Sequence, residues 1–128
     1  MPPVDDPAIE NEDGLLRRIH PNHIVPDDIG GYRVSSAAFG DSQLSIDIHS
    51  ILLAAGLNEN ECVRAYEGYG LVSITAGLAR QQQQLVYKDP IPENPAHGIV
   101  DGKKSASVKK ALVGQCQWVI DTRPPPID

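Results

Sequence analysis

Proline placement constrains the fold of this chain more than any other feature of its sequence. Three of the 11 prolines precede residue 8, three lie within 90–95 and three follow Arg123. Proline lacks a backbone N–H and fixes its φ angle, so these clusters disfavour helix interiors and sheet ladders. We therefore expect a flexible acidic arm at 1–13, one globular domain at 14–122 and a Pro-rich tail at 123–128.

Length and charge bound the class of protein. The 128 residues suit a single domain, and the formal net charge of −6 opposes broad binding to nucleic acid or to an anionic membrane surface. Five acidic residues and no Lys or Arg occupy 1–13, so the rest of the chain is close to neutral. The N-terminus has no basic segment followed by an apolar run, and no stretch is long and apolar enough to span a membrane. We expect a small cytoplasmic protein.

Short runs rich in β-branched and aromatic residues, bounded by turn residues, predict β-strands on both sides of the proline loop. The predicted strands are 16–20, 32–35, 71–75, 85–88 and 96–100. The first two are expected to form a hairpin, because a cluster of Asp and Gly residues separates them. Shorter helical segments are expected from Asn58 to Gly68 and from Ala76 to Gln83.

Two longer segments favour helices. Over 105–120, Val108, Leu112, Cys116 and Val119 recur at spacings of four, four and three, which is the spacing of one helix face. The segment 44–57 fits both a strand and a helix, and its length and closing glycine favour the helix. The expected fold is therefore α+β, with a mixed or antiparallel sheet packed by the C-terminal amphipathic helix and by 44–57.

Three histidines are the candidate catalytic residues, because an imidazole can donate or accept a proton near pH 7. His20 and His23 follow a pair of arginines, and His97 follows the proline loop. Pro21 prevents one helix face from presenting both His20 and His23, so their spacing alone does not predict a metal site. The chain's two cysteines have no zinc-type spacing, and no motif identifies a cofactor.

A run of lysines forms the second candidate site. Lys103, Lys104, Lys109 and Lys110 place four positive charges within eight residues at the start of the predicted C-terminal helix. Unsatisfied amides at a helix start add to such a positive field. Together with Arg18, these lysines are the candidate residues for binding an anion or a partner, although such a run is also typical of a solvated helix face.

Two functional hypotheses follow from these residues. The first is a small interaction module that binds a protein or an anionic partner through the basic helix face. The alternative is a small enzyme or metal-binding protein that uses His20, His23 and His97 on an anionic, phosphate-containing substrate. Convergence of the three imidazoles on one pocket would favour the alternative.

Overall fold

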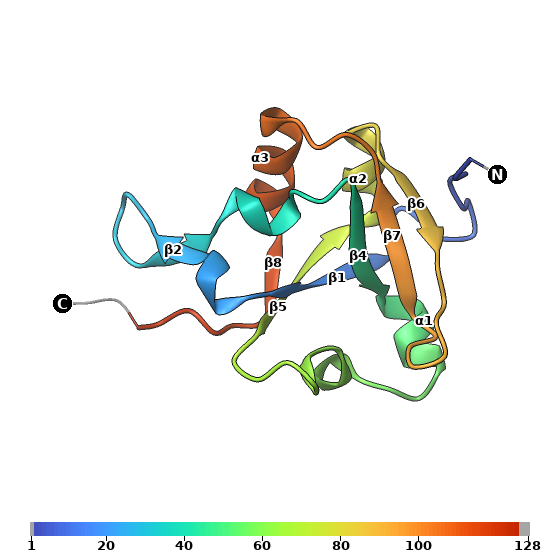
Figure 1. Ribbon diagram of the computed structural model, residues 1–128, viewed down its shortest axis with the longest axis horizontal. Coiled ribbons are helices and arrows are strands. Elements are labelled where there is room, and N and C mark those ends of the chain that lie inside the picture. The colour runs from blue at the N-terminus through green and yellow to red at the C-terminus, as the bar shows by residue number, and fades with distance from the viewer. Residues whose placement is uncertain (1, 126–128) are drawn as a thin grey trace.

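The computed structural model describes residues 2–125 and centres on an antiparallel sheet (Figure 1). Its strands lie in the order β6-β7-β4-β1-β5-β8, and every neighbouring pair is antiparallel. The strands are β1 (Gly14–Ile19), β4 (Gln43–Ile48), β5 (Gly70–Thr75), β6 (Leu85–Lys88), β7 (His97–Asp101) and β8 (Gln117–Ile120). The expectation of an α+β fold with a C-terminal helix beside the sheet is confirmed.

Short helices connect the strands, and several begin at a residue whose side chain accepts a backbone hydrogen bond. The α-helices are α1 (His49–Ala54), α2 (Ala76–Gln81) and α3 (Ala106–Gln115), and the 3-10 helices are η1 (Pro21–His23), η2 (Ser36–Phe39) and η3 (Glu59–Val63). The Oγ1 of Thr75 accepts from the N–H of Leu78 at the start of α2, and the Oγ of Ser105 accepts from the N–H of Val108 at the start of α3. These bonds satisfy amides that a helix start leaves without a partner.

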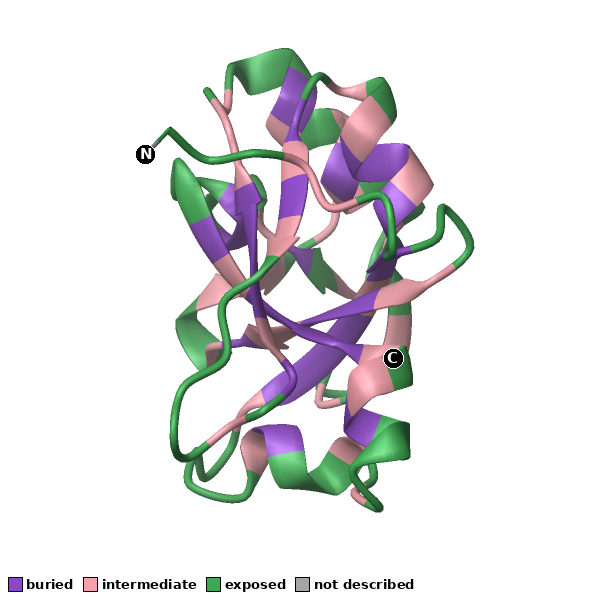
Figure 2. Cartoon of the chain, turned by 90° about the vertical axis from the view of Figure 1, so that its right-hand side faces the viewer, coloured by how far each residue is buried: buried purple, intermediate pink, exposed green. Residues whose placement is uncertain are grey.

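Strand alternation gives the sheet an apolar contact on each face. In β1, Leu15 and Ile19 belong to the larger cluster of buried residues, which includes α2, α3 and η2, whereas Leu16 belongs to a smaller cluster with Leu52 and Cys62. Successive side chains of a strand point to opposite faces, which explains this division. Figure 2 shows the buried residues concentrated along the strands and the exposed residues in loops and outer helix turns. One of the two pockets described below lies against the smaller cluster.

The segment 44–57 is part strand and part helix, so its interpretation as one helix is wrong. Leu44, Ile46 and Ile48 alternate into the larger cluster along β4, which pairs with β7 and, at its end, with β1. The helix α1 begins only at His49, and Gly56 closes it at a positive φ of 77°. Pairing with neighbours on both sides favours the strand, and this contact is not visible in a local pattern.

The C-terminal helix is shorter than predicted. It ends at Gln115, Cys116 adopts an extended conformation, and the following residues form β8 at the edge of the sheet. Val108 and Leu112 are buried as expected, but Val119 is 40% exposed on the strand. Pairing of Trp118 with Val72 in β5 ends the helical spacing that the sequence continues to 120.

The predicted hairpin between 16–20 and 32–35 is also replaced by other pairings. The strand at β3 (Tyr32–Val34) pairs with β2 (Ile24–Pro26), and these two form a separate small sheet. The strand β1 instead lies between β4 and β5 in the main sheet. The cluster of Asp and Gly residues before Tyr32 therefore closes the hairpin of β2 and β3, with Gly30 and Gly31 at positive φ.

The acidic segment 1–13 is expected to be a flexible arm, but several of its residues between 2 and 13 contact the domain. The N–H of Asp6 donates to the carbonyl of Val86 in the edge strand β6, and the carboxylate of Asp5 accepts from the N–H of Val86. Asp5 also pairs with Arg80 of α2, and Ile9 is 2% exposed in the larger cluster. The N-terminal segment thus packs in part against the domain, whereas residues 126–128 of the Pro-rich tail expected at 123–128 lie outside the described residues.

Candidate functional site

Two adjacent arginines in β1 have very different surroundings. The guanidinium of Arg17 donates to the carbonyls of Ala38 and Ser45 and lies 3.8 Å from the carboxylate of Asp41. Burial lowers the pKa of Arg17, and the charge of Asp41 opposes that shift. This arginine is engaged in holding η2 and β4 to β1.

Arg18 points to the other side and keeps free donors. Its Nη1 donates to the carbonyl of Cys62 at 3.3 Å and lies 3.7 Å from the carboxylate of Asp47, while the side chain is 24% exposed. Within residues 2–125, its Nε and Nη2 groups have no hydrogen-bond acceptor. A half-buried guanidinium with unused donors is suited to a planar or tetrahedral oxyanion.

Arg18 and Tyr66 border two pockets. The first, here the His20 pocket, has a volume of about 480 Å³. It is lined by Arg17, Arg18, His20, Asn22, His23, Tyr66 and Tyr69. Its lining holds two guanidinium groups, two imidazoles and no carboxylate, so its field favours an anion.

Aromatic contacts hold the cationic groups of the His20 pocket in place. The guanidinium carbon of Arg18 lies 4.3 Å from the centre of the Tyr66 ring, and the Tyr66 and Tyr69 rings are 5.1 Å apart. His20 meets Tyr69 edge-on at 5.1 Å, and the His20 and His23 rings are 6.1 Å apart. Stacking of this kind restricts the rotamers of the Arg and His side chains before any ligand arrives.

The hydrogen bond of His20 determines which ring nitrogen is available. Its Nδ1 accepts from the N–H of Asn22 at 2.9 Å at the start of η1. A ring nitrogen that accepts carries no proton, so Nε2 carries the N–H of the neutral ring. His20 therefore offers an N–H donor in its neutral form.

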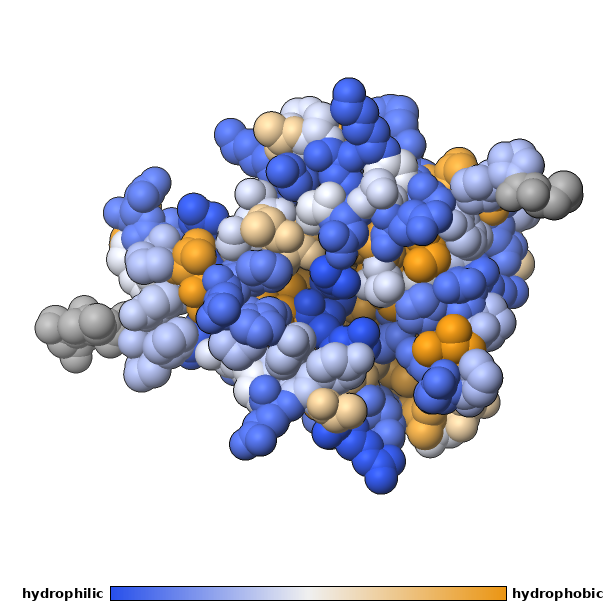
Figure 3. All heavy atoms as spheres, viewed as in Figure 1, coloured by the Kyte–Doolittle hydropathy of each residue, from blue (hydrophilic) through white to orange (hydrophobic). Residues whose placement is uncertain are grey.

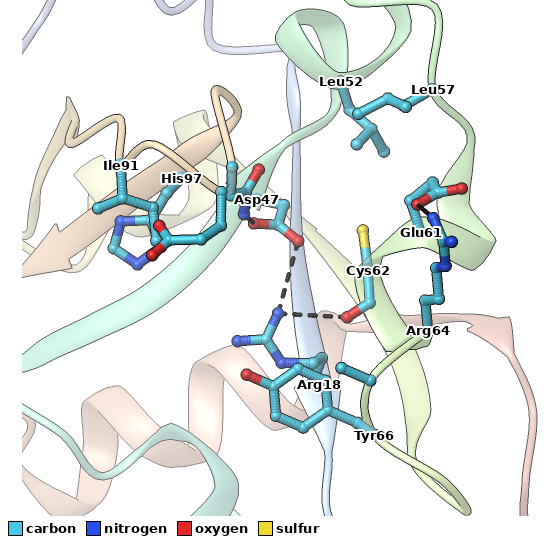
Figure 4. A pocket seen from close by; sticks show the side chains of 13 residues that line it. Arg18, Asp47, Leu52, Leu57, Glu61, Cys62, Arg64, Tyr66, Ile91 and His97 are labelled. Carbon is cyan, nitrogen blue, oxygen red and sulfur yellow. Dashed lines mark hydrogen bonds and ion pairs between the residues drawn. The ribbon is translucent and has the colours of Figure 1, made fainter.

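The second pocket, here the Asp47 pocket, has a volume of about 750 Å³ and lies against the smaller apolar cluster (Figure 4). Apart from Arg18 and Tyr66, its lining comprises Asp47, Leu52, Leu57, Glu61, Cys62, Arg64, Ala65, Ile91, Glu93, Asn94 and His97. Figure 4 shows Leu52 and Leu57 on one side, Ile91 and His97 on the other, and the Arg18 guanidinium between Tyr66 and Asp47.

Asp47 is the most buried charged residue of this pocket, with 2% of its surface exposed. Its carboxylate accepts from the amide of Asn94 at 2.6 Å and lies 3.7 Å from Arg18. Burial, followed by the neighbouring Asp47 carboxylate, raises the pKa of the Cys62 thiol well above its usual range. Cys62 is therefore a protonated, apolar wall of the pocket and not an activated nucleophile.

The three candidate histidines do not line one pocket. His20 and His23 line the His20 pocket, whereas His97 lines the Asp47 pocket and is only 14% exposed. The Nδ1 of His97 lies 2.8 Å from the carbonyl of Asp89 and 3.2 Å from its carboxylate. In the part of the chain that the structure describes, no three His, Cys, Asp or Glu side chains are placed to hold one metal ion.

The lysine run is divided by its contacts. The ammonium of Lys104 donates to the carbonyls of Ser42, Val100 and Gly102, so this group is committed to the fold. Lys109 is half-buried beside η2, whereas Lys103 and Lys110 are exposed. In the face shown in Figure 3, apolar side chains form separate spots and no continuous patch.

The sequence did not predict that Asp47, Tyr66 and Tyr69 lie near Arg18, or that Asn94 bonds Asp47. Asp47 interrupts an apolar strand, and a charged residue between Ile46 and Ile48 was the one available signal. The other three come from loops far along the chain, whose approach to β1 has no local signature. Arg18 was named from the sequence among the anion-binding candidates, and its Nη1 contacts the carbonyl of Cys62 and the carboxylate of Asp47.

Comparison of the chain with protein-family models, with curated proteins and with solved structures found no match. Among the described residues, none of the helices has both the length and the apolar character that crossing a membrane requires.

Proposed function

We propose that the protein binds a small ligand through an anionic group of the phosphate type, held in the His20 pocket. The observation that carries this proposal is the half-buried guanidinium of Arg18, which borders the pocket with Nε and Nη2 donors unused among residues 2–125. The N–H of His20 supplies a further donor at the same pocket. Arginine donors in a fixed fork match the oxygen spacing of phosphates and carboxylates.

Charge distinguishes the His20 pocket from the neighbouring one as the place for the anion. The Asp47 pocket has three carboxylates in its lining, whereas the His20 pocket has none. An anion in the His20 pocket therefore meets only cationic and neutral groups. Its attraction to Arg18 is stronger than to a fully solvated guanidinium, because only 24% of the Arg18 side chain is exposed.

The basic helix face supports the same class of ligand less well. Its Lys104 ammonium already has three carbonyl acceptors, and Lys103 and Lys110 are solvated. The anionic partner expected from the sequence is therefore proposed to contact Arg18 and not the basic helix face. Lys110 serves as the reference cation for the test, since it lies outside both pockets.

The test compares inorganic phosphate binding to the wild type with binding to Arg18→Gln and Lys110→Gln. Hydrogen bonds to charged groups contribute about 1.5–3 kcal/mol, so Arg18→Gln should weaken binding roughly 10- to 100-fold. Lys110→Gln should change it less than about twofold, as expected for a solvent-screened charge. Isothermal titration calorimetry measures both, and NMR shifts of the Arg18, His20 and His23 signals locate the site.

Removing Arg18 also leaves buried Asp47 without its cation, which endangers the fold. Arg18→Lys is the second variant: it keeps a positive charge near Asp47 but lacks the planar fork. It should remain folded by circular dichroism and still bind phosphate more weakly than the wild type. Equal losses in the Arg18 and Lys110 variants, or no shifts at His20 and His23, would refute the proposed site.

A further inference from the structure

The Asp47 pocket borders the proposed anion site at two shared residues. Both pockets are lined by the same guanidinium, that of Arg18, and by the same ring, that of Tyr66. A group bonded to Arg18 therefore lies at the border of a further 750 Å³. Volumes of about 300–1,000 Å³ are typical of sites for small organic molecules.

Two of the three carboxylates in the lining of the Asp47 pocket are paired. Asp47 is held by Arg18 and Asn94, and Glu61 accepts from Arg64 at 3.3 Å. The remaining surface includes Leu52, Leu57 and Ile91. Away from Glu93, a ligand group entering this pocket meets apolar side chains and paired charges, so an uncharged apolar group is favoured there.

Glu93 limits the charge that the ligand can carry in this pocket. Its carboxylate is exposed in the loop before β7 and has no ion-pair partner among residues 2–125. A second negative charge on the ligand beside Glu93 would be repelled by this unpaired carboxylate, whereas a neutral or cationic group would not be repelled.

We propose that the ligand is a small organic phosphate monoester or similar organic anion, whose apolar body occupies the Asp47 pocket beside Leu52 and Ile91. Its anionic group lies at Arg18, and the part of the ligand next to Glu93 is neutral or cationic. This inference rests on the proposed function and adds the class of ligand to it. The test separates the two by using inorganic phosphate and phenyl phosphate as probes.

Phenyl phosphate should bind the wild type roughly tenfold or more tightly than inorganic phosphate, because the ring is removed from water. Ile91→Ser should remove most of that advantage and leave the affinity for inorganic phosphate unchanged. Ile91 is 41% exposed, so its truncation does not open the core. Ile29→Ser is the matched control, since Ile29 is 91% exposed and lines neither pocket.

The charge preference beside Glu93 is tested with two substituted ligands. Phenyl phosphate with a para-carboxylate should bind several-fold more weakly than the same compound with a para-aminomethyl group. Glu93→Gln should reduce this difference, and Glu67→Gln, an exposed carboxylate outside both pockets, should not. Titration calorimetry at one ionic strength gives the comparison of the two ligands in all three proteins.

The possible results distinguish failure of the ligand class from failure of the anion site. Phosphate binding with no gain from the phenyl ring, or an equal loss in Ile29→Ser, overturns this inference and leaves the anion site standing. A gain from the ring that Ile91→Ser abolishes supports both. Absence of binding by either probe at millimolar concentration overturns the proposed function and this inference with it.

Discussion

Gly98 in β7 occupies a position where no side chain fits. A Cβ built there would lie 2.8 Å from the Cδ1 of Ile48 and 3.0 Å from the Cδ1 of Ile46. Both isoleucines are buried in the central strand β4, so they cannot move away without disturbing the larger cluster. Gly98 is therefore required for close approach of β7 to β4.

Gly98→Ala should lower the free energy of unfolding by about 1–3 kcal/mol, the usual cost of overpacking. The control is Gly114→Ala in α3, where an added Cβ meets no atom within 4 Å. Alanine is the better helix former, so this variant should gain up to about 1 kcal/mol. Urea unfolding of the two variants measures both, and a loss at both positions would contradict the packing explanation.

At the scale of elements, the sequence predicts the strand and helix types better than their pairing and limits. The strands near 71–75, 85–88 and 96–100 and the start of α3 agree with the structure. The segment 44–57 and the end of α3 do not, because contacts with β1, β7 and β5 override the local spacing. Arg18, His20 and His23 could be chosen as candidates from the sequence, but the approach of Tyr66 and Tyr69 to them could not, because these rings come from a loop far along the chain.

The connection from β7 to α3 gives a prediction about pH. Burial lowers the pKa of Lys104 from 10.5 to about 8, while the charges of Asp101 and Asp41 oppose the shift. The folded protein then holds fewer protons at this group than the unfolded chain between pH 8 and 10.5, so stability rises with pH there. The neutral amine still has two N–H donors for the surrounding carbonyls.

The measurement compares urea unfolding of the wild type and Lys104→Met at pH 7 and pH 9.5. The free energy of unfolding of the wild type should rise relative to that of the variant between these values. A parallel change in both proteins, or a relative fall of the wild type, would show that the buried ammonium does not release its proton in this range. The comparison cancels the titration of other groups.

At the scale of the whole molecule, the N-terminal segment is placed along one edge of the sheet. Asp5 and Asp6 bond the backbone of Val86 in β6, and an ion pair joins Asp6 to Lys88. Exposed edge strands are prone to pair with other chains, so a covering segment protects this edge. The negative charges of Asp5 and Asp6 in this segment are partly neutralised by Arg80 and Lys88 of the domain.

Ile9→Ala should destabilise the whole domain by about 2–5 kcal/mol, the usual range for truncating a buried isoleucine. Val4→Ala is the control, because Val4 lies in the same segment and is 69% exposed. Thermal unfolding followed by circular dichroism gives both values. If Ile9→Ala were as stable as Val4→Ala, the segment would not be part of the cooperative unit.

The register of β1 has a consequence for how this protein tolerates insertions and deletions. Arg17 and Arg18 are the same type of residue, and the alternation of the strand assigns Arg17 to the carbonyls of η2 and β4 and only Arg18 to the border of both pockets. A single residue gained or lost in the Glu12–Gly14 stretch, if absorbed by a slip of the strand, would exchange their positions. Leu16 would then leave its apolar cluster and the pockets would receive a different side chain. A change of length outside both pockets would thus alter ligand binding while every lining residue remained in the sequence.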